Sequence, residues 1–128
     1  MQDPVIPEEV QRFLAEQVES AEQLDTLVLL HSHPERAWTA EAVSQAIYTV
    51  PQAAAKTLAR LAERGLAASN GANPPGYRYA ADPRLHPSIA SLAETYRTHR
   101  VAVVKHLYAS RVDPVRSFAD AFRLKKDR

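Results

Sequence analysis

The sequence predicts a mainly α-helical fold with one small β-hairpin, organised around residues 39–76. Three observations support this fold class. Apolar residues recur at intervals of three and four over most of the 128 residues, which is helical spacing. Two predicted helices, residues 39–47 and 52–64, are joined by a tight turn. Two short segments, residues 66–69 and 77–80, flank a loop rich in proline, glycine and asparagine, which is typical of a hairpin.

Length and composition predict one globular chain without a strongly charged surface. Hydrophobic residues make up 45% of the sequence and charged residues 24%, so wholesale disorder is not expected. The formal net charge is +1, so any attraction to nucleic acid must come from how the charges are distributed. We divide the chain into an N-terminal arm and helix (residues 1–19), a central unit (20–81) and C-terminal helices expected to dimerise (82–128).

Several kinds of protein are disfavoured by what the sequence lacks. The chain has no cysteine, which excludes disulfides, thiol nucleophiles and Cys-ligated zinc. Three glycines leave little material for a phosphate-binding loop, and the histidines follow no catalytic order, so we expect neither an enzyme nor a cofactor. The sequence has no run of about 18 apolar residues and no signal-peptide pattern, so we expect no membrane partner and a cytoplasmic location.

Two amphipathic helices are predicted before the central pair. The first begins at Pro7, which suits the first position of a helix. The second follows Ser20, which forms a capping box with Gln23, and it ends before Pro34. This second helix is apolar enough to be the core helix of the domain. The two apolar faces comprise Val10, Phe13, Leu14, Val18, Leu24, Leu27 and Val28.

His31 and His33 lie at the end of the second helix and are one residue apart, so they could hold a metal ion. No cysteine or carboxylate cluster accompanies them. The alternative is that their imidazoles contact the last carbonyl groups of the helix. We favour this alternative and expect no metal site.

The helix at residues 52–64 carries the main functional signal. Thr49 can cap it, Pro51 fits its first turn and Gly65 is the expected left-handed stop. An alanine- and leucine-rich side faces the core. The other side carries amide and cationic residues at intervals of four, namely Gln52, Lys56, Arg60 and Arg64.

The stretch Leu58-Ala-Arg-Leu-Ala-Glu-Arg-Gly-Leu66, preceded by Thr49-Val-Pro-Gln52, resembles part of bacterial winged-helix regulators such as the MarR, ArsR and PadR groups. The similar part is their recognition helix and first wing strand, and the resemblance covers about residues 20–81. It implies a winged helix-turn-helix fold. It also implies a DNA-binding transcriptional regulator whose second helix enters the major groove.

The resemblance implies a set of DNA contacts by position. Gln52 and Lys56 are candidates for base edges, since Gln can pair with adenine and Lys can donate to guanine. Arg60 and Arg64, further along the helix, would contact backbone phosphates. Further contacts to the backbone are expected from Thr39, from Ser44, which is placed outward, from Thr49 and from Arg78.

The alternative function is a winged-helix protein-interaction module without specific DNA binding. The loop at residues 70–76 has no basic residue, whereas wings that enter a minor groove usually carry Arg or Lys. The fold often serves as a docking platform, and a basic stripe can simply be solvated. Both functions stay open on the sequence alone.

The C-terminal third predicts one long helix from Pro87 to about residue 109. Val101, Val104, Leu107 and Tyr108 make its second half apolar around most of its girth, so this helix needs partners on two sides. One partner is expected to be the N-terminal helix and the other a second copy, which predicts a homodimer. Six residues form the heptad-like dimer seam, namely Ile89, Leu92, Tyr96, His99, Val103 and His106.

His99 and His106 lie one heptad apart on that seam. If a dimer pairs them, their charging at low pH would weaken it, and the alternative is that each is a satisfied, partly buried histidine.

A last helix is predicted to start at Asp113 and Pro114, with a basic end. Val115, Phe118, Ala119 and Phe122 form its apolar face. Two exposed phenylalanines would be costly, so we expect this segment to dock on a partner subunit or in a groove elsewhere. Phe118 and Phe122 therefore join the predicted dimerisation residues.

Overall fold

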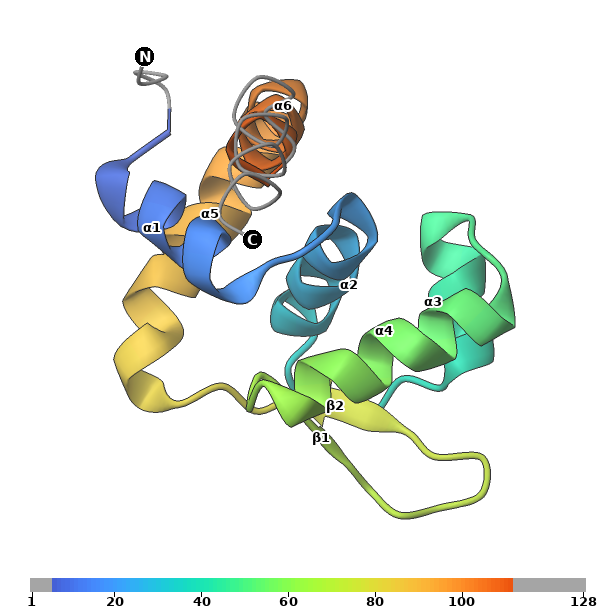
Figure 1. Cartoon of the computed structure of the whole chain (residues 1–128). Helices are drawn as coiled ribbons and strands as arrows, with labels where there is room; N and C mark the ends of the chain where they lie inside the picture. Colours follow the sequence, from blue (N-terminus) through green and yellow to red (C-terminus); the bar gives the residue numbers. More distant parts are fainter. Residues whose placement is uncertain (1–5, 112–128) are drawn as a thin grey trace, which may run out of the picture.

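The computed structural model of the chain describes residues 6–111. This part is mainly helical and holds one antiparallel sheet of two strands, as the sequence predicts (Figure 1). The predicted last helix, with Phe118 and Phe122, lies outside the described residues. The elements in order are α1 (Glu8–Gln17), α2 (Ala21–Ser32), α3 (Ala40–Ile47), α4 (Pro51–Glu63), β1 (Ala67–Ser69), β2 (Tyr77–Tyr79), the 3₁₀ turn η1 (Pro83–Leu85), α5 (His86–Thr98) and α6 (Arg100–Arg111).

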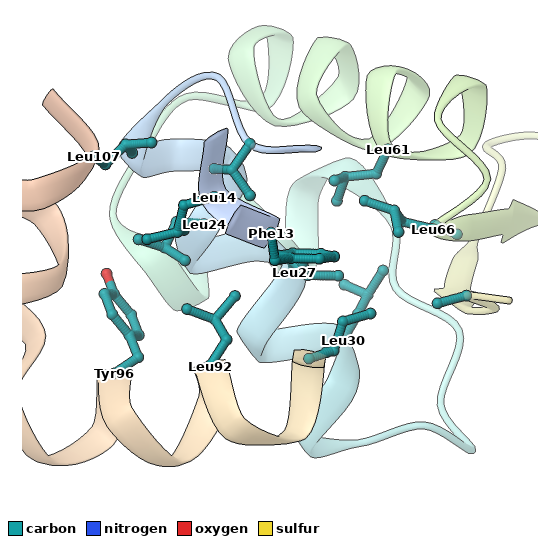
Figure 2. Close-up of a cluster of buried hydrophobic side chains, with 14 of the residues drawn as sticks. Phe13, Leu14, Leu24, Leu27, Leu30, Leu61, Leu66, Leu92, Tyr96 and Leu107 are labelled. Atoms are coloured by element: carbon teal, nitrogen blue, oxygen red, sulfur yellow. The ribbon is translucent and has the colours of Figure 1, made fainter. Parts of the chain in front are cut away.

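The core is built around α2, as its apolar sequence predicts. Leu24, Leu27 and Leu30 of α2 are fully buried. Figure 2 shows them next to Leu14 of α1 and Leu92 of α5. One cluster of buried residues extends from α1 through to α6, so the three predicted segments of the chain share a single core. Each fully buried leucine contributes about 1.5–3 kcal/mol to folding through the hydrophobic effect.

Ser20 caps the start of α2, as predicted, and Thr39 caps the start of α3. Ser20 Oγ accepts a hydrogen bond from the N–H of Gln23 at 3.1 Å, and the side chain of Gln23 reaches back to the N–H of Glu19. Thr39 Oγ1 accepts a hydrogen bond from the N–H of Ala42 at 3.2 Å. These bonds satisfy backbone donors that a helix start would otherwise leave unpaired.

The hairpin is tied to the segment that precedes α3. Ala67 pairs with Tyr79 and Ser69 with Tyr77 across the two strands. Trp38 adds a bridge on the other side of β2, since its N–H donates to the Tyr77 carbonyl at 2.7 Å and its carbonyl accepts at 2.8 Å. The Trp38 side chain is buried. The hairpin and the start of α3 are therefore held in a fixed relation.

The prediction of one long C-terminal helix is wrong, because the chain breaks at His99. α5 ends at Thr98, and His99 has φ −137° and ψ 51°, which is not helical. Asp25 of α2 holds both sides of the break, since it accepts a hydrogen bond from the Tyr96 hydroxyl and pairs with Arg100 at 3.2 Å. α6 packs on α1 as well as on α5. The contacts to α1 and α2 thus replace the continuity of one helix.

The predicted dimer seam is therefore used inside the chain. Four of its six residues are buried in the core, namely Ile89, Leu92, Tyr96 and Val103. His99 is exposed at the break and His106 is half-buried. A broken helix does not present these positions on one continuous face, so the seam and the pairing of His99 with His106 across it are both incorrect. The heptad-like spacing reflects two core-facing helices in succession.

Candidate nucleic-acid interface

α3 and α4 meet at a sharp turn, residues 48–50. Tyr48 closes α3 in the left-handed region with φ 60°. α4 begins at Pro51, with Val50 as its N-cap and no side chain hydrogen-bonded to its start. The predicted capping by Thr49 is therefore wrong. The turn places the first residues of α4 at the tip of this helix pair.

The outer face of α4 is open to solvent within the described part of the chain. α4 packs mainly on α2, α3 and β1. Figure 1 shows α4 and the hairpin on the side of the molecule away from α6. Gln52 and Lys56, the two candidates for base edges, both lie on this face. Its exposed residues are Gln52, Ala55, Lys56, Ala59 and Glu63.

Arg60 and Arg64 do not share that face. Residues four apart on an α-helix are rotated by about 40° beyond a full turn, so a stripe from Gln52 to Arg64 rotates by about 120°. The two arginines therefore lie on the flank of α4 that faces the α1–α2 linker. Glu19 in that linker lies 2.8 Å from Arg60 Nη2 and 2.5 Å from Arg64 Nη2, both through Oε2. Both arginines are thus paired with Glu19 in this structure, and their contacts to phosphates stay a prediction.

The pairing shifts the pKa of Glu19 and the pKa of Arg60. Hydrogen bonds from Arg60, then Arg64 and Gln23, hold the pKa of the Glu19 carboxyl well below its ordinary value. The same Glu19 contact raises the pKa of Arg60, and Glu63 at 3.0 Å adds to this effect. Arg64 also donates from Nη1 to the backbone carbonyl of Glu16 at 3.2 Å. We call Glu19, Arg60 and Arg64 the flank triad.

The predicted hydroxyl contacts are mostly used inside the protein. Ser44 is buried and donates to the Glu41 carbonyl at 2.7 Å, so its outward placement is wrong. Thr49 Oγ1 donates to Glu22 Oε1 at 3.2 Å and Thr57 Oγ1 donates to Glu22 Oε2 at 3.0 Å. A buried hydroxyl needs such a partner, which the helical periodicity does not reveal. Thr39, the remaining hydroxyl of the set, caps α3.

The hairpin loop is held by one asparagine. Asn70 Oδ1 accepts hydrogen bonds from the N–H groups of Ala72 and Gly76, both at 2.9 Å. A Cβ on Gly76 would lie 2.9 Å from Asn70 Nδ2, so a side chain there would disturb this closure. Arg78 on β2 is exposed beside the loop, whereas Arg84 is paired with Asp82 at 3.1 Å. Arg78 is thus the cation that the hairpin presents to solvent.

The tip of the α3–α4 turn is apolar, which the sequence reasoning did not single out. Tyr48 is 94% exposed and Val50 is 58% exposed. Both precede the outer face of α4 directly, next to the exposed Pro51. The sequence feature that could have predicted this apolar tip is the presence of two large apolar residues within a three-residue turn. Residues in a tight turn seldom reach the core.

A second cluster joins α2, β2 and α5. The His31 and Tyr79 rings meet edge to face with centroids 5.2 Å apart, and Tyr79 Oη lies 2.8 Å from His86 Nδ1. Burial, and then the nearby His86, lower the pKa of His31 below its ordinary value of 6.5. The predicted contact of His31 with helix carbonyls is thus replaced by an aromatic contact, and His33 lies against Trp38 with centroids 5.8 Å apart.

We expect acidification to destabilise the fold through His31. The unfolded chain takes up a proton at His31 near pH 6.5, and the folded chain does so only at lower pH. The stability that the neutral imidazole provides is therefore present above pH 6.5 and lost as the pH falls through the folded pKa. Urea unfolding between about pH 7.5 and 5.5 measures this loss. His31→Gln should flatten the profile and His33→Gln should not; equal slopes for wild type and His31→Gln would contradict the assignment.

Within residues 6–111, no three His, Asp or Glu side chains gather as a metal ion would require. No helix in the same range has the length and hydropathy needed to cross a bilayer. Comparison with protein-family models, with curated proteins and with solved structures gave no match.

Proposed function

We propose that this chain is a winged helix-turn-helix protein that binds double-stranded DNA through α4, in the manner of a transcriptional regulator. The observation that supports this most is the uncovered outer face of α4, with Gln52 and Lys56 exposed at its start. The order of α2, α3, α4, β1 and β2, with Trp38 bridged to β2, is the order expected of a winged helix. The proposed function is binding, and no catalytic step is part of it.

The proposed mode of binding uses few charges. The first turns of α4 enter the major groove, where Gln52 and Lys56 reach base edges. Arg78 contacts a phosphate from the hairpin side. Arg60 and Arg64 are engaged by Glu19. With Lys56 and Arg78 as the two cations that each chain brings to the proposed interface, the logarithm of the affinity should fall with the logarithm of salt concentration at a slope of about −1.8, which is shallow.

The proposal includes a homodimer in the bacterial cytoplasm. Helix-turn-helix dimers read two half-sites about one helical turn of DNA apart, and two copies double the number of phosphate contacts. The surface that joins the copies must differ from the predicted seam, since its apolar residues are buried within one chain. Sedimentation of the full chain with and without a duplex measures the number of copies bound.

Lys56→Ala is expected to weaken binding to duplex DNA roughly tenfold at low salt, because it removes one charged contact at the groove. Fluorescence anisotropy with mixed genomic fragments measures the affinity without knowledge of the target sequence. Lys105→Ala is the matched control, since it removes the same charge from an exposed position on α6. Equal affinities for the two variants would remove α4 from the proposed interface.

A second candidate function is docking of another protein at the α3–α4 tip. The exposure of Tyr48 and Val50 favours it, because exposed apolar side chains beside one another often mark a binding surface. The flank triad favours it too, since it occupies two cations that could otherwise contact phosphates. Two measurements separate the two functions. One is the effect of Tyr48→Ala on docking of the other protein, and the other is the retention of the chain on DNA. A chain that fails to bind genomic DNA even at low salt, with its fold intact, would leave docking as the better proposal.

A further inference from the structure

The side chain of Tyr48 projects into solvent from the turn between α3 and α4. It is 94% exposed, although a tyrosine ring carries a large apolar surface. Tyr48 is also the one non-glycine residue among residues 6–111 with a positive φ, at φ 60° and ψ 51°. Glycine or asparagine is the usual choice at such a left-handed helix end, because a Cβ is crowded there. Neither burial nor backbone preference therefore accounts for a tyrosine at this position.

The turn holds the backbone of Tyr48 in a fixed place. The N–H groups of Tyr48 and Thr49 both donate to the carbonyl of Ser44, and the Thr49 bond measures 2.9 Å. The Thr49 hydroxyl donates to Glu22 of α2 at 3.2 Å. A tyrosine side chain has only two torsions to fix, so little affinity is lost when a partner orders it. The tip thus presents a ring on a fixed base, with a hydrogen-bonding group at its end.

We propose that Tyr48 contacts the sugar–phosphate backbone of duplex DNA at the edge of the major groove that receives α4. This inference rests on the proposed function and adds an uncharged contact to it. The ring covers a deoxyribose, and the hydroxyl donates a hydrogen bond to a phosphate oxygen. Such a contact holds the start of α4 in register on the duplex without reading a base.

The position of Tyr48 relative to α4 supports this contact. An α-helix with its side chains is about 10–12 Å across and fills a major groove about 12 Å wide. Residues just beyond the end of the helix therefore lie over the rim of the groove, where the phosphates run. Tyr48 comes four residues before Gln52, so their Cα atoms are at most about 15 Å apart. A base contact by Gln52 thus leaves the Tyr48 ring within reach of the nearest backbone strand.

The surroundings of the tip favour DNA over a protein partner. The exposed apolar tip consists of Tyr48, Val50 and Pro51, whereas a standard protein interface uses about 20–30 residues on each side. Residues 48–57 carry one charged side chain, the cationic Lys56. The carboxylate of Glu22 lies beside the turn, but both of its oxygens accept hydrogen bonds from threonines. This part of the surface therefore suits a polyanion.

Tyr48→Gly tests the contact without destabilising the fold. Glycine adopts the left-handed conformation readily, so the equilibrium constant for folding should rise roughly threefold in urea titrations. The affinity for mixed genomic duplexes, measured by fluorescence anisotropy, should fall roughly tenfold at constant salt, because the ring and the hydroxyl are both lost. The slope of log affinity against log salt should stay unchanged, since the lost side chain is neutral. Lys56→Ala should instead make that slope shallower by about 0.9 for each bound copy.

Two further variants define the contact. Tyr48→Phe keeps the ring and should lose about threefold in affinity, so wild-type affinity in this variant would overturn the bond from the hydroxyl to phosphate. Val101→Ala removes a 69% exposed apolar side chain from α6, which lies away from α4, and should bind as the wild type does (Figure 1). Unchanged affinity in Tyr48→Gly, or an equal loss in Val101→Ala, would overturn the proposal; the first result would leave the tip to protein docking. A wild-type chain that does not bind DNA at all would remove the proposed function and this contact together.

Discussion

Glu19→Gln is expected to raise the affinity for duplex DNA at least tenfold at low salt. The carboxylate of Glu19 holds the guanidinium groups of both Arg60 and Arg64, at 2.8 and 2.5 Å. A neutral amide cannot neutralise the two cations, so both become available to phosphates along the flank of α4. Each new phosphate contact adds about 0.9 to the steepness of the salt dependence, which at roughly 0.1 M salt is worth close to tenfold in affinity.

Glu16→Gln is the matched control for this experiment. It removes the same charge three residues earlier, from an exposed side chain, while its backbone carbonyl can still accept the hydrogen bond from Arg64. A general gain from lower negative charge would appear in both variants. A gain in affinity confined to Glu19→Gln, together with a steeper salt dependence, would mean that the flank triad lowers the affinity of the wild-type chain for DNA. Equal affinities and slopes for the two variants would show that the arginines do not reach a duplex.

Local signals in the sequence predict the helices and their ends well. Ser20 caps the helix that follows it, and Gly65 is left-handed with φ 77° after α4, as predicted. These features depend on residues only a few positions apart, so a single sequence contains the information needed. The exposure of Gln52 and Lys56 follows from helical periodicity for the same reason.

The flank triad could not be predicted in this way. Glu19 lies 41 residues from Arg60 and 45 from Arg64, and no periodic pattern relates positions so far apart. The stripe of residues four apart was read as one face, although the rotation of about 40° at each step carries its second half to the flank. Only the position of the α1–α2 linker decides whether that flank meets solvent or a carboxylate.

The break at His99 illustrates a second limit of periodicity. Apolar spacing continues through the break, because α5 and α6 each turn an apolar face to the core. A pattern that continues does not distinguish one helix with a partner from two helices that share one core. Asp25 stabilises the break, since it contacts Tyr96 on one side of it and Arg100 on the other. These residues lie 71 and 75 positions away from Asp25 in the sequence.

Glu22 is the carboxylate that fixes the α3–α4 turn to α2. It accepts hydrogen bonds from Thr49 in the turn and from Thr57 on the inner side of α4. Thr57 is only 8% exposed, so removal of its acceptor leaves a buried hydroxyl without this partner. Such a loss costs about 1–3 kcal/mol. We expect Glu22→Ala to lower the free energy of unfolding by about that amount in urea titrations.

Glu41→Ala supplies the control, since Glu41 and Glu22 each lie in the first turn of a helix and gain the same favourable interaction with the helix dipole. The difference between the two variants therefore isolates the hydrogen bonds to the threonines. A double-mutant cycle with Thr57→Val sharpens the result, because the two changes remove one interaction and should cost less together than the sum of their separate effects. Additive costs, or a loss no larger than that of Glu41→Ala, would mean that Glu22 does not fix the turn. If the coupling is found, loss of DNA affinity in Glu22→Ala follows from a displaced α4 start, because Gln52 depends on the position of the turn that precedes it.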